Sequence, residues 1–228
     1  MSTATRLYPG HGPDERTSFE PYSAFDIPED LRELHGRYDV EATARRIRNF
    51  RYTHEWMTMV MGGWIATIPE IPVKTGLGKI IWETAQAADV LGKRLPELRA
   101  GRNLATASQP PNDRYAALIQ EIAAPDSPEQ TVEKLAGLFD VLAPHLIDIY
   151  EQTMRATDQI CDAPTIELLD EIVRRLRHHV AWAKDVLDRL ADTDAKRERR
   201  RARIEQVRGL LLESRGVTGE LDGSPVHH

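Results

Sequence analysis

The sequence is poor in cysteine, in aromatic residues and in long apolar runs. Cys161 is the only cysteine among 228 residues, so an internal disulfide or a cysteine-based metal site is excluded. The longest uncharged stretch contains Met57 to Pro69, which is shorter than the roughly 20 residues that cross a bilayer. The first residues also lack the apolar run of a secretory signal. We therefore predict a cytoplasmic protein without membrane partners.

No alternation of apolar and polar residues marks a strand, and the composition is that of a globular helical protein. The net charge of −6 gives nucleic acid no general reason to bind. The basic run Lys196–Arg203 contains acidic residues and follows others, which favours a solvated helix face. The abundance of arginine and alanine is associated with bacterial coding sequences. The length predicts one domain at 39–215, with an extended N-terminal arm at 1–38 and a flexible tail at 216–228.

Apolar residues recur at spacings of three and four, which predicts an all-α fold of four long helices and a shorter C-terminal one. Asp39 is the expected N-cap of the first helix, and Ser127 is that of the third. Pro144 is expected to kink the third helix. The expected helices cover residues 39–68, 72–99, 127–158, 162–190 and 194–215, and the segment 102–126 is a long crossover with a short helix at 112–123.

Several ionisable residues lie on or beside the apolar stripes, where an unpaired charge is costly and is usually kept for pairing, metal binding or catalysis. The register of the first hairpin places Glu55 and Glu83 at the same depth to within roughly 3 Å. In the second hairpin, His179 is expected opposite His145. The full set of candidates is His54, Glu55, Glu83, Gln86, His145, Asp148, Glu151 and His179.

Two hairpins joined by a crossover, with carboxylates and histidines pointing inward, resemble the ferritin-like superfamily over about residues 39 to 190. That family places its metal ligands as Glu, Glu-x-x-His, Glu and Glu-x-x-His on successive helices. Glu55 matches the first position. Glu83-x-x-Gln86 matches the second with glutamine for histidine, and Leu176-x-x-His179 matches the fourth with leucine for glutamate. The third position falls best on Glu151.

The resemblance implies a small-molecule biosynthetic enzyme of specialised metabolism that binds iron or manganese. We predict Glu55, Glu83 and His179 as metal ligands and catalytic groups, and these residue types suit a non-haem oxidase or oxygenase. The fourth ligand is Glu151, with His145 and Asp148 as alternatives for that position. The residues predicted to contact substrate or orient the ligands are Tyr52, His54, Gln86 and Trp82.

Two other functions stay open at this point. Because Leu176 and Gln86 replace metal ligands, a metal-free cyclase, isomerase or lyase could use the buried glutamates and histidines as acid and base. Alternatively, the protein is a non-enzymatic helical binding protein. Glu55 and Glu83 would then only pair with arginines such as Arg51, and His179 would be a hydrogen-bonded core histidine. A homodimer is a possible assembly.

Overall fold

A computed structural model describes residues 36–99 and 108–220, and every regular element in these ranges is helical. The all-α prediction is therefore confirmed. The predicted helix ends agree with the observed ones to within two residues. The elements are α2 (Val40–Thr67), α3 (Ile71–Glu97), α5 (Asp113–Ala123), η2 (Pro128–Gln130), α6 (Thr131–Leu135), η3 (Ala136–Leu142), α7 (Ala143–Ala156), α8 (Ala163–Leu190) and α9 (Asp194–Ser214).

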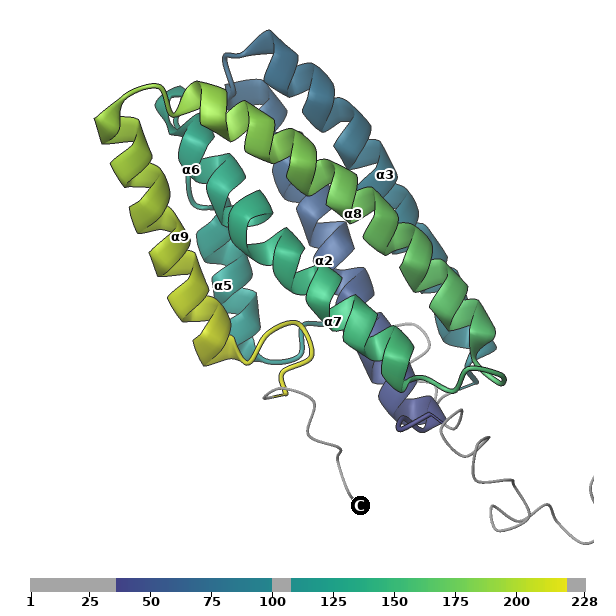
Figure 1. The fold of residues 1–228 in the computed structure, drawn as a ribbon. Helices are drawn as coiled ribbons and strands as arrows, with labels where there is room; N and C mark the ends of the chain where they lie inside the picture. Colours follow the sequence, from purple (N-terminus) through teal and green to yellow (C-terminus); the bar gives the residue numbers. More distant parts are fainter. Residues whose placement is uncertain (1–35, 100–107, 221–228) are drawn as a thin grey trace, which may run out of the picture.

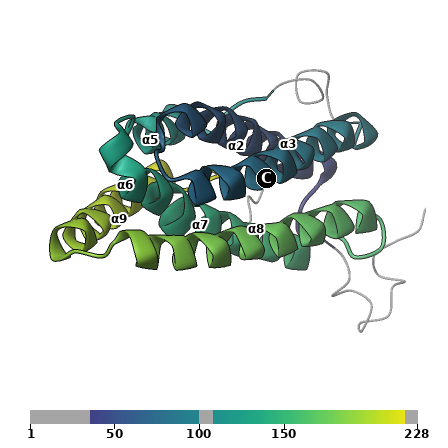
Figure 2. The same ribbon diagram turned by 90° about the horizontal axis from the view of Figure 1, so that it is seen from above.

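The helices form two layers, which Figure 1 shows one behind the other and Figure 2 shows edge on. One layer contains α5, α2 and α3. The other contains α9, the continuous helix from α6 to α7, and α8. The buried stripes of both layers meet in a single hydrophobic core that receives side chains from every long helix. The core therefore lies between two hairpins, α2–α3 and α7–α8, with α5 and α9 flanking them.

Local capping explains where the helices begin. The Asp39 side chain accepts a hydrogen bond from the Ala42 amide at 2.6 Å, which satisfies one of the unpaired donors of the first turn of α2. Ser127 and Gln130 form a reciprocal capping box at the start of η2. Both caps were predicted, because the signal lies within four residues of sequence.

The third helix continues through Pro144, where a kink was predicted. Proline has no backbone donor, and its ring crowds the carbonyl four residues earlier. The chain accommodates this by widening to a π-helix at η3, where the Ala143 amide bonds the Leu138 carbonyl five residues back. The helix then continues as α7. The helix thus accommodates the proline through a seven-residue π-helical segment, Ala136–Leu142.

Gly76 allows α3 to approach α8 closely. A Cβ atom at Gly76 would lie 2.3 Å from the indole ring of Trp182, so the ring occupies the space that a side chain would need. The other side of the ring packs edge-on against Phe139, with 6.0 Å between the ring centroids. Trp182 therefore links α3, α8 and η3 in one contact.

Ion pairs bind the basic C-terminal helix to the bundle. Arg200 donates to both carboxylate oxygens of Asp140 on η3, at 2.8 and 3.0 Å. Arg203 is buried and donates to Glu121 of α5 at 2.8 Å. The run Lys196–Arg203 is therefore not a purely solvated face, because two of its arginines hold α9 against its neighbours.

The chain ends are described only in part. Residues 216–220, predicted as the start of a flexible tail, pack on the bundle: Val217 is fully buried and Glu220 pairs with Arg46. Gly216 has a φ of 70°, which glycine adopts without strain, and a Cβ atom there would lie 2.5 Å from the His145 ring. Residues 1–35 of the arm predicted at 1–38, and the last residues of the tail, 221–228, lie outside the described residues.

Candidate functional site

Glu83 and His179 meet across the interface between α3 and α8. The Glu83 Oε2 and His179 Nε2 atoms are 2.7 Å apart, and the exposed fractions of the two side chains are 16% and 5%. Lys79, one turn before Glu83 on α3, lies 3.6 Å from the other carboxylate oxygen. Both residues were predicted as metal ligands, and the structure brings them together in a direct hydrogen bond.

The environment fixes the protonation of this pair. Burial lowers the pKa of His179 and outweighs the opposite effect of Glu83. Burial acts to raise the pKa of Glu83, but the hydrogen bond from His179 and the charges of Lys79 and Arg175 outweigh it and lower this pKa. Near neutral pH the pair is therefore a carboxylate and a neutral imidazole. The Nε2–H group donates to Glu83, and the lone pair is on Nδ1.

A second buried pair lies in the core beside the first. The His54 Nε2 atom on α2 is 3.0 Å from the Tyr150 hydroxyl on α7, and both residues are almost completely buried. Burial, with a smaller contribution from His179, lowers the pKa of His54 to about 3. Burial also raises the pKa of Tyr150 well above its ordinary value. Both side chains are therefore neutral over the physiological range.

These pairs belong to one polar layer, which we define as His54, Glu83, Thr84, Tyr150 and His179. His54 lies as many residues before the end of α2 as Thr84 lies after the start of α3. In an antiparallel hairpin the two residues are therefore at the same depth. Three buried polar atoms of the layer have no hydrogen-bond partner among the described residues: His54 Nδ1, Thr84 Oγ1 and His179 Nδ1. Such atoms are costly inside a core, which makes this polar layer a candidate for a functional site.

A surface groove of about 410 Å³ begins one helical turn from the Glu83–His179 pair. At its near end, Arg175 on α8 donates to Gln86 Oε1 on α3 at 2.9 Å. Half of the lining residues are apolar. The charged ones are three carboxylates and one arginine, so the groove carries a net negative charge and favours cationic ligands. Its lining consists of Gln86, Ala87, Asp89, Val90, Pro164, Glu167, Leu168, Glu171, Ile172 and Arg175.

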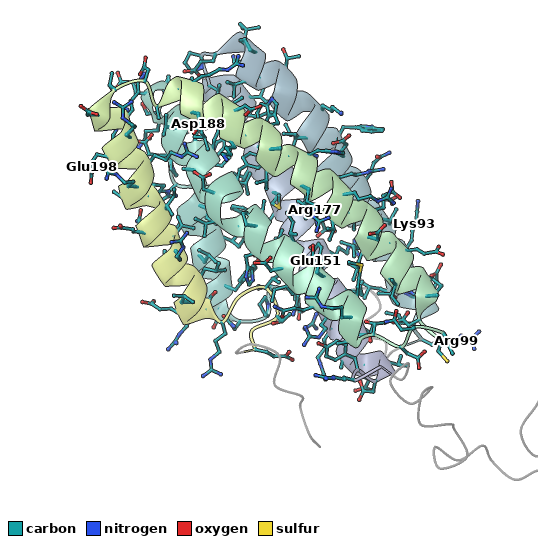
Figure 3. All side chains as sticks on the ribbon, in the orientation of Figure 1. Lys93, Arg99, Glu151, Arg177, Asp188 and Glu198 are labelled. Atoms are coloured by element: carbon teal, nitrogen blue, oxygen red, sulfur yellow. The ribbon has the colours of Figure 1, made fainter. Side chains whose placement is uncertain are left out.

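Two of the predicted metal ligands lie apart from the polar layer. Glu55 accepts from Arg51 Nε at 2.7 Å and from the Ser108 hydroxyl, as in the ion-pair alternative. Glu151 pairs with Arg177, and Figure 3 shows this pair on the outer side of α7 and α8. Glu55 and Glu151 therefore have polar partners of their own, away from His179.

The remaining donors among the described residues are fewer than the predicted iron or manganese centre would use. Over residues 36–99 and 108–220, no three His, Cys, Asp or Glu side chains come together as metal ligands. Glu83 and His179 supply two donors, whereas a non-haem mononuclear centre uses three. Lys79 also stands beside the carboxylate, where its ammonium would oppose a second cation.

The alternatives for the fourth ligand also lie outside the polar layer. His145 accepts a hydrogen bond from the Val217 amide at 3.0 Å and so anchors the C-terminal segment. Asp148 is exposed on α7. Tyr150, two residues further on, is the side chain of α7 that reaches the layer.

The predicted substrate contacts are divided in the same way. His54 is in the polar layer, and Gln86 lines the groove. Tyr52 is half-buried and packs against the hydrophobic core. Trp82 is 60% exposed on a face of α3 that points away from α8, so it contacts neither the layer nor the groove.

Sequence reasoning missed Tyr150, Thr84 and Arg175. Tyr150 and Thr84 were missed because each occupies a regular position on an apolar stripe and was therefore interpreted as a core residue. For Tyr150 a signal did exist, because a tyrosine on a buried stripe needs a partner for its hydroxyl. Arg175 lies on the polar flank of α8 and gave no signal that distinguished it from its neighbours.

Comparison of the chain with protein-family models, with curated proteins and with solved structures gave no match. None of the helices within residues 36–99 and 108–220 has the length and apolarity that a membrane crossing requires. The function must therefore be argued from the polar layer and the groove.

Proposed function

We propose that this protein is a metal-independent acid–base enzyme on a four-helix bundle of the ferritin-like type. His179 is the base, Glu83 orients it, and the substrate is a small organic molecule with a cationic group. The observation that carries the proposal is the Glu83–His179 pair, in which one imidazole nitrogen is held by a carboxylate while the other is buried with no partner among the described residues.

The pair has the features of an activated imidazole. The carboxylate holds the proton on Nε2, which leaves the Nδ1 lone pair available to accept a proton from a substrate. When Nδ1 becomes protonated, the adjacent negative charge of Glu83 stabilises the imidazolium. Burial at 5% exposure keeps water from competing for the same lone pair. The arrangement therefore suits proton transfer in an isomerisation, cyclisation or elimination.

The groove supports the choice of substrate. Asp89, Glu167 and Glu171 contribute three negative charges, and Arg175 contributes one positive charge that also pairs with Glu171. An amine with an apolar body would place its charge against these carboxylates and its body on Val90 and the neighbouring apolar floor. Gln86 and Arg175, which bond to each other at the end of the groove, are each one helical turn from a member of the pair, so a substrate in the groove would reach His179 by displacing this contact.

Proton exchange in heavy water tests this proposal even though the substrate is unidentified. The purified protein is incubated with a bacterial small-molecule extract in D₂O containing a strong chelator, and the extract is analysed by mass spectrometry. We expect a cationic compound to gain deuterium or to be converted. His179→Gln should slow this reaction by about 10²- to 10⁴-fold, the usual contribution of a general base.

Glu83→Gln and Glu151→Gln form a matched pair of variants. Both remove a carboxylate charge, but only Glu83 contacts His179, whereas Glu151 pairs with Arg177. Only the Glu83 variant should lose the reaction. Loss of the reaction in the chelator, or full activity in His179→Gln, contradicts the proposal, and so does an extract in which no compound changes.

A further inference from the structure

The polar layer contains three buried atoms without a hydrogen-bond partner among the described residues: His54 Nδ1, Thr84 Oγ1 and His179 Nδ1. The exposed fractions of these residues are 1%, 1% and 4%. Thr84 follows Glu83, which bonds His179. The charge of His179 also contributes to the lowered pKa of His54, as a neighbouring group does. The three atoms therefore lie in one region of the core, where α2 and α3 of one layer face α8 of the other (Figure 2).

The hydrogen bond to Tyr150 decides which nitrogen of His54 carries the proton. The Tyr150 hydroxyl has His54 Nε2 as its one partner among the described residues, at 3.0 Å. If Nε2 carried the proton, it would donate to the hydroxyl oxygen, and the hydroxyl proton would be buried without an acceptor. If the hydroxyl donates to Nε2 instead, both groups are satisfied and the imidazole proton is on Nδ1. His54 Nδ1–H is therefore a buried donor that faces no acceptor of the described residues.

His179 and Thr84 complete the set with an acceptor and a second donor. The Nε2–H group of His179 donates to Glu83, so its Nδ1 atom is an acceptor. A threonine hydroxyl in a helix often bonds the carbonyl four residues back, as those of Thr53 and Thr153 do here. The Thr84 hydroxyl makes no such bond, so its proton is available to a ligand. The layer thus offers two donors and one acceptor.

Two donors and one acceptor match a carbonyl group with an acidic C–H bond beside it. The carbonyl oxygen can accept from both donors, while the hydrogen on the adjacent carbon meets the base. Loss of this hydrogen as a proton moves negative charge onto the oxygen, and buried donors that already point at the oxygen stabilise this charge. A substrate without a carbonyl would leave both donors unpaired in the core, which is costly.

We propose that His54 and Thr84 hold the carbonyl oxygen of a cationic ketone or aldehyde while His179 removes a proton from the adjacent carbon. This inference rests on the proposed function and names the class of its substrate. The C–H electron pair forms a C=C bond, and the carbonyl π pair moves to oxygen, which gives an enolate. The imidazolium of His179 then returns the proton to the same carbon or, in an unsaturated substrate, to a carbon conjugated with it. Tyr150 is a positioning residue, because it keeps the proton of His54 on Nδ1.

Nitrogen-15 NMR tests the assignment of donor and acceptor without any substrate. In labelled protein near neutral pH, His54 should be protonated on Nδ1 and His179 on Nε2, and the variants His54→Phe and His179→Gln assign the two sets of signals. In Tyr150→Phe the Nε2-protonated form of His54 should appear. An Nε2-protonated His54 in the wild type would overturn the inference, and it would leave the role of His179 as the base untouched.

The exchange experiment in D₂O tests the substrate class. After incubation with the protein, the extract is treated with an O-alkylhydroxylamine, which converts ketones and aldehydes to oximes, and is compared with an extract incubated without protein. The compound that gains deuterium or is converted should form an oxime. A labelled compound that forms no oxime would overturn the carbonyl assignment while the acid–base function stands. An extract in which no compound changes contradicts both.

Thr84→Val and Thr153→Val are a matched pair of variants. Both replace a buried helical threonine by a nearly isosteric valine, but the Thr153 hydroxyl bonds the Ile149 carbonyl of its own helix, α7. Thr84→Val should slow the exchange by about 10²- to 10³-fold, the usual effect of removing one donor to an oxyanion. Thr153→Val should keep the wild-type rate, and circular dichroism should show that both variants are folded. A wild-type rate in Thr84→Val would overturn the inference, and if that variant does not fold, the protonation of His54 in the wild type still decides.

Discussion

The buried imidazole of His54 couples the core to pH. Its pKa is about 3 in the folded protein against an ordinary value of 6.5, so between these values the unfolded chain binds a proton that the folded chain does not. The free energy of unfolding must therefore fall as the pH falls from about 6.5 towards 3. The lowered pKa of His179 acts in the same direction, and the lowered pKa of Glu83 adds to it below pH 4.5.

Urea unfolding at a series of pH values checks this expectation. His54→Phe should remove one proton from the linkage and flatten the acid limb by up to about 1.4 kcal/mol per pH unit. The unpaired Tyr150 hydroxyl adds a cost of about 1 kcal/mol that does not depend on pH. Equal slopes in the wild type and His54→Phe would contradict this explanation.

A buried lysine shows how single residues close the end of the bundle. Lys134 is completely buried, and burial lowers its pKa. Its ammonium group donates to the Thr67 hydroxyl and to the carbonyls of Asp126 and Ser127, at 2.7 to 3.1 Å. Three donors thus meet three acceptors, which ties α6 to the last turn of α2, and the charges of Asp126 and Glu70 partly oppose the effect of burial on the pKa.

At the scale of elements, the approach of α3 to α8 depends on Gly76. Gly76→Ala places a methyl group 2.3 Å from the Trp182 ring, so either the ring or the helix must move. We expect a loss of about 1 to 3 kcal/mol in the free energy of unfolding, despite the better helix propensity of alanine. Chemical denaturation measures this difference.

Gly209→Ala provides the comparison, because Gly209 is an exposed helical glycine whose added Cβ would meet nothing within 4 Å. This variant should be stabilised by up to about 1 kcal/mol. Replacing Trp182 by leucine should recover part of the loss in Gly76→Ala, because the smaller side chain frees the space. If the two alanine variants are equally stable, Gly76 does not control the contact.

The helix boundaries were predictable because the signals that set them are local. Asp39, Ser127 and the prolines near the turns act on amides within a few residues, whatever lies elsewhere in the fold. The response to Pro144 was not predictable in the same way. A kink and a π-helical widening can each relieve the steric conflict, and the local sequence does not distinguish them; in the structure the widened segment η3 contacts α8 and α9.

For the whole molecule, a single core predicts a single unfolding transition. The buried residues of both layers form one cluster that includes α2, α3, α7, α8 and Val207 of α9. Far-ultraviolet circular dichroism and tryptophan fluorescence should therefore give coincident denaturation curves. The fluorescence reports on both layers, because Trp64 lies in α2 and Trp182 in α8. Two separated transitions would show that the hairpins unfold independently.

The candidate site was predicted in part. The sequence placed Glu83 and His179 on or beside the inward stripes of the two hairpins, and these two residues do meet. The sequence also placed Glu55 at this site, but in the structure Glu55 accepts hydrogen bonds from Arg51 and Ser108 instead. The salt bridge between Arg51 and Glu55 has a spacing of four residues, which the sequence contained. The choice between this local pair and a shared site depends on the rotation of α2 about its axis.

The sequence by itself determined the helical content, the ends of the helices and the residues that enter the core, because caps, prolines and apolar periodicity act over a few residues. Only the tertiary structure decided which polar groups meet. The pairing of His54 with Tyr150, of Glu83 with His179 and of Arg175 with Gln86 requires helices that are 89 to 96 residues apart in sequence to take one relative rotation. Packing of side chains such as Trp182 on Gly76 sets that rotation, and no short-range signal encodes it.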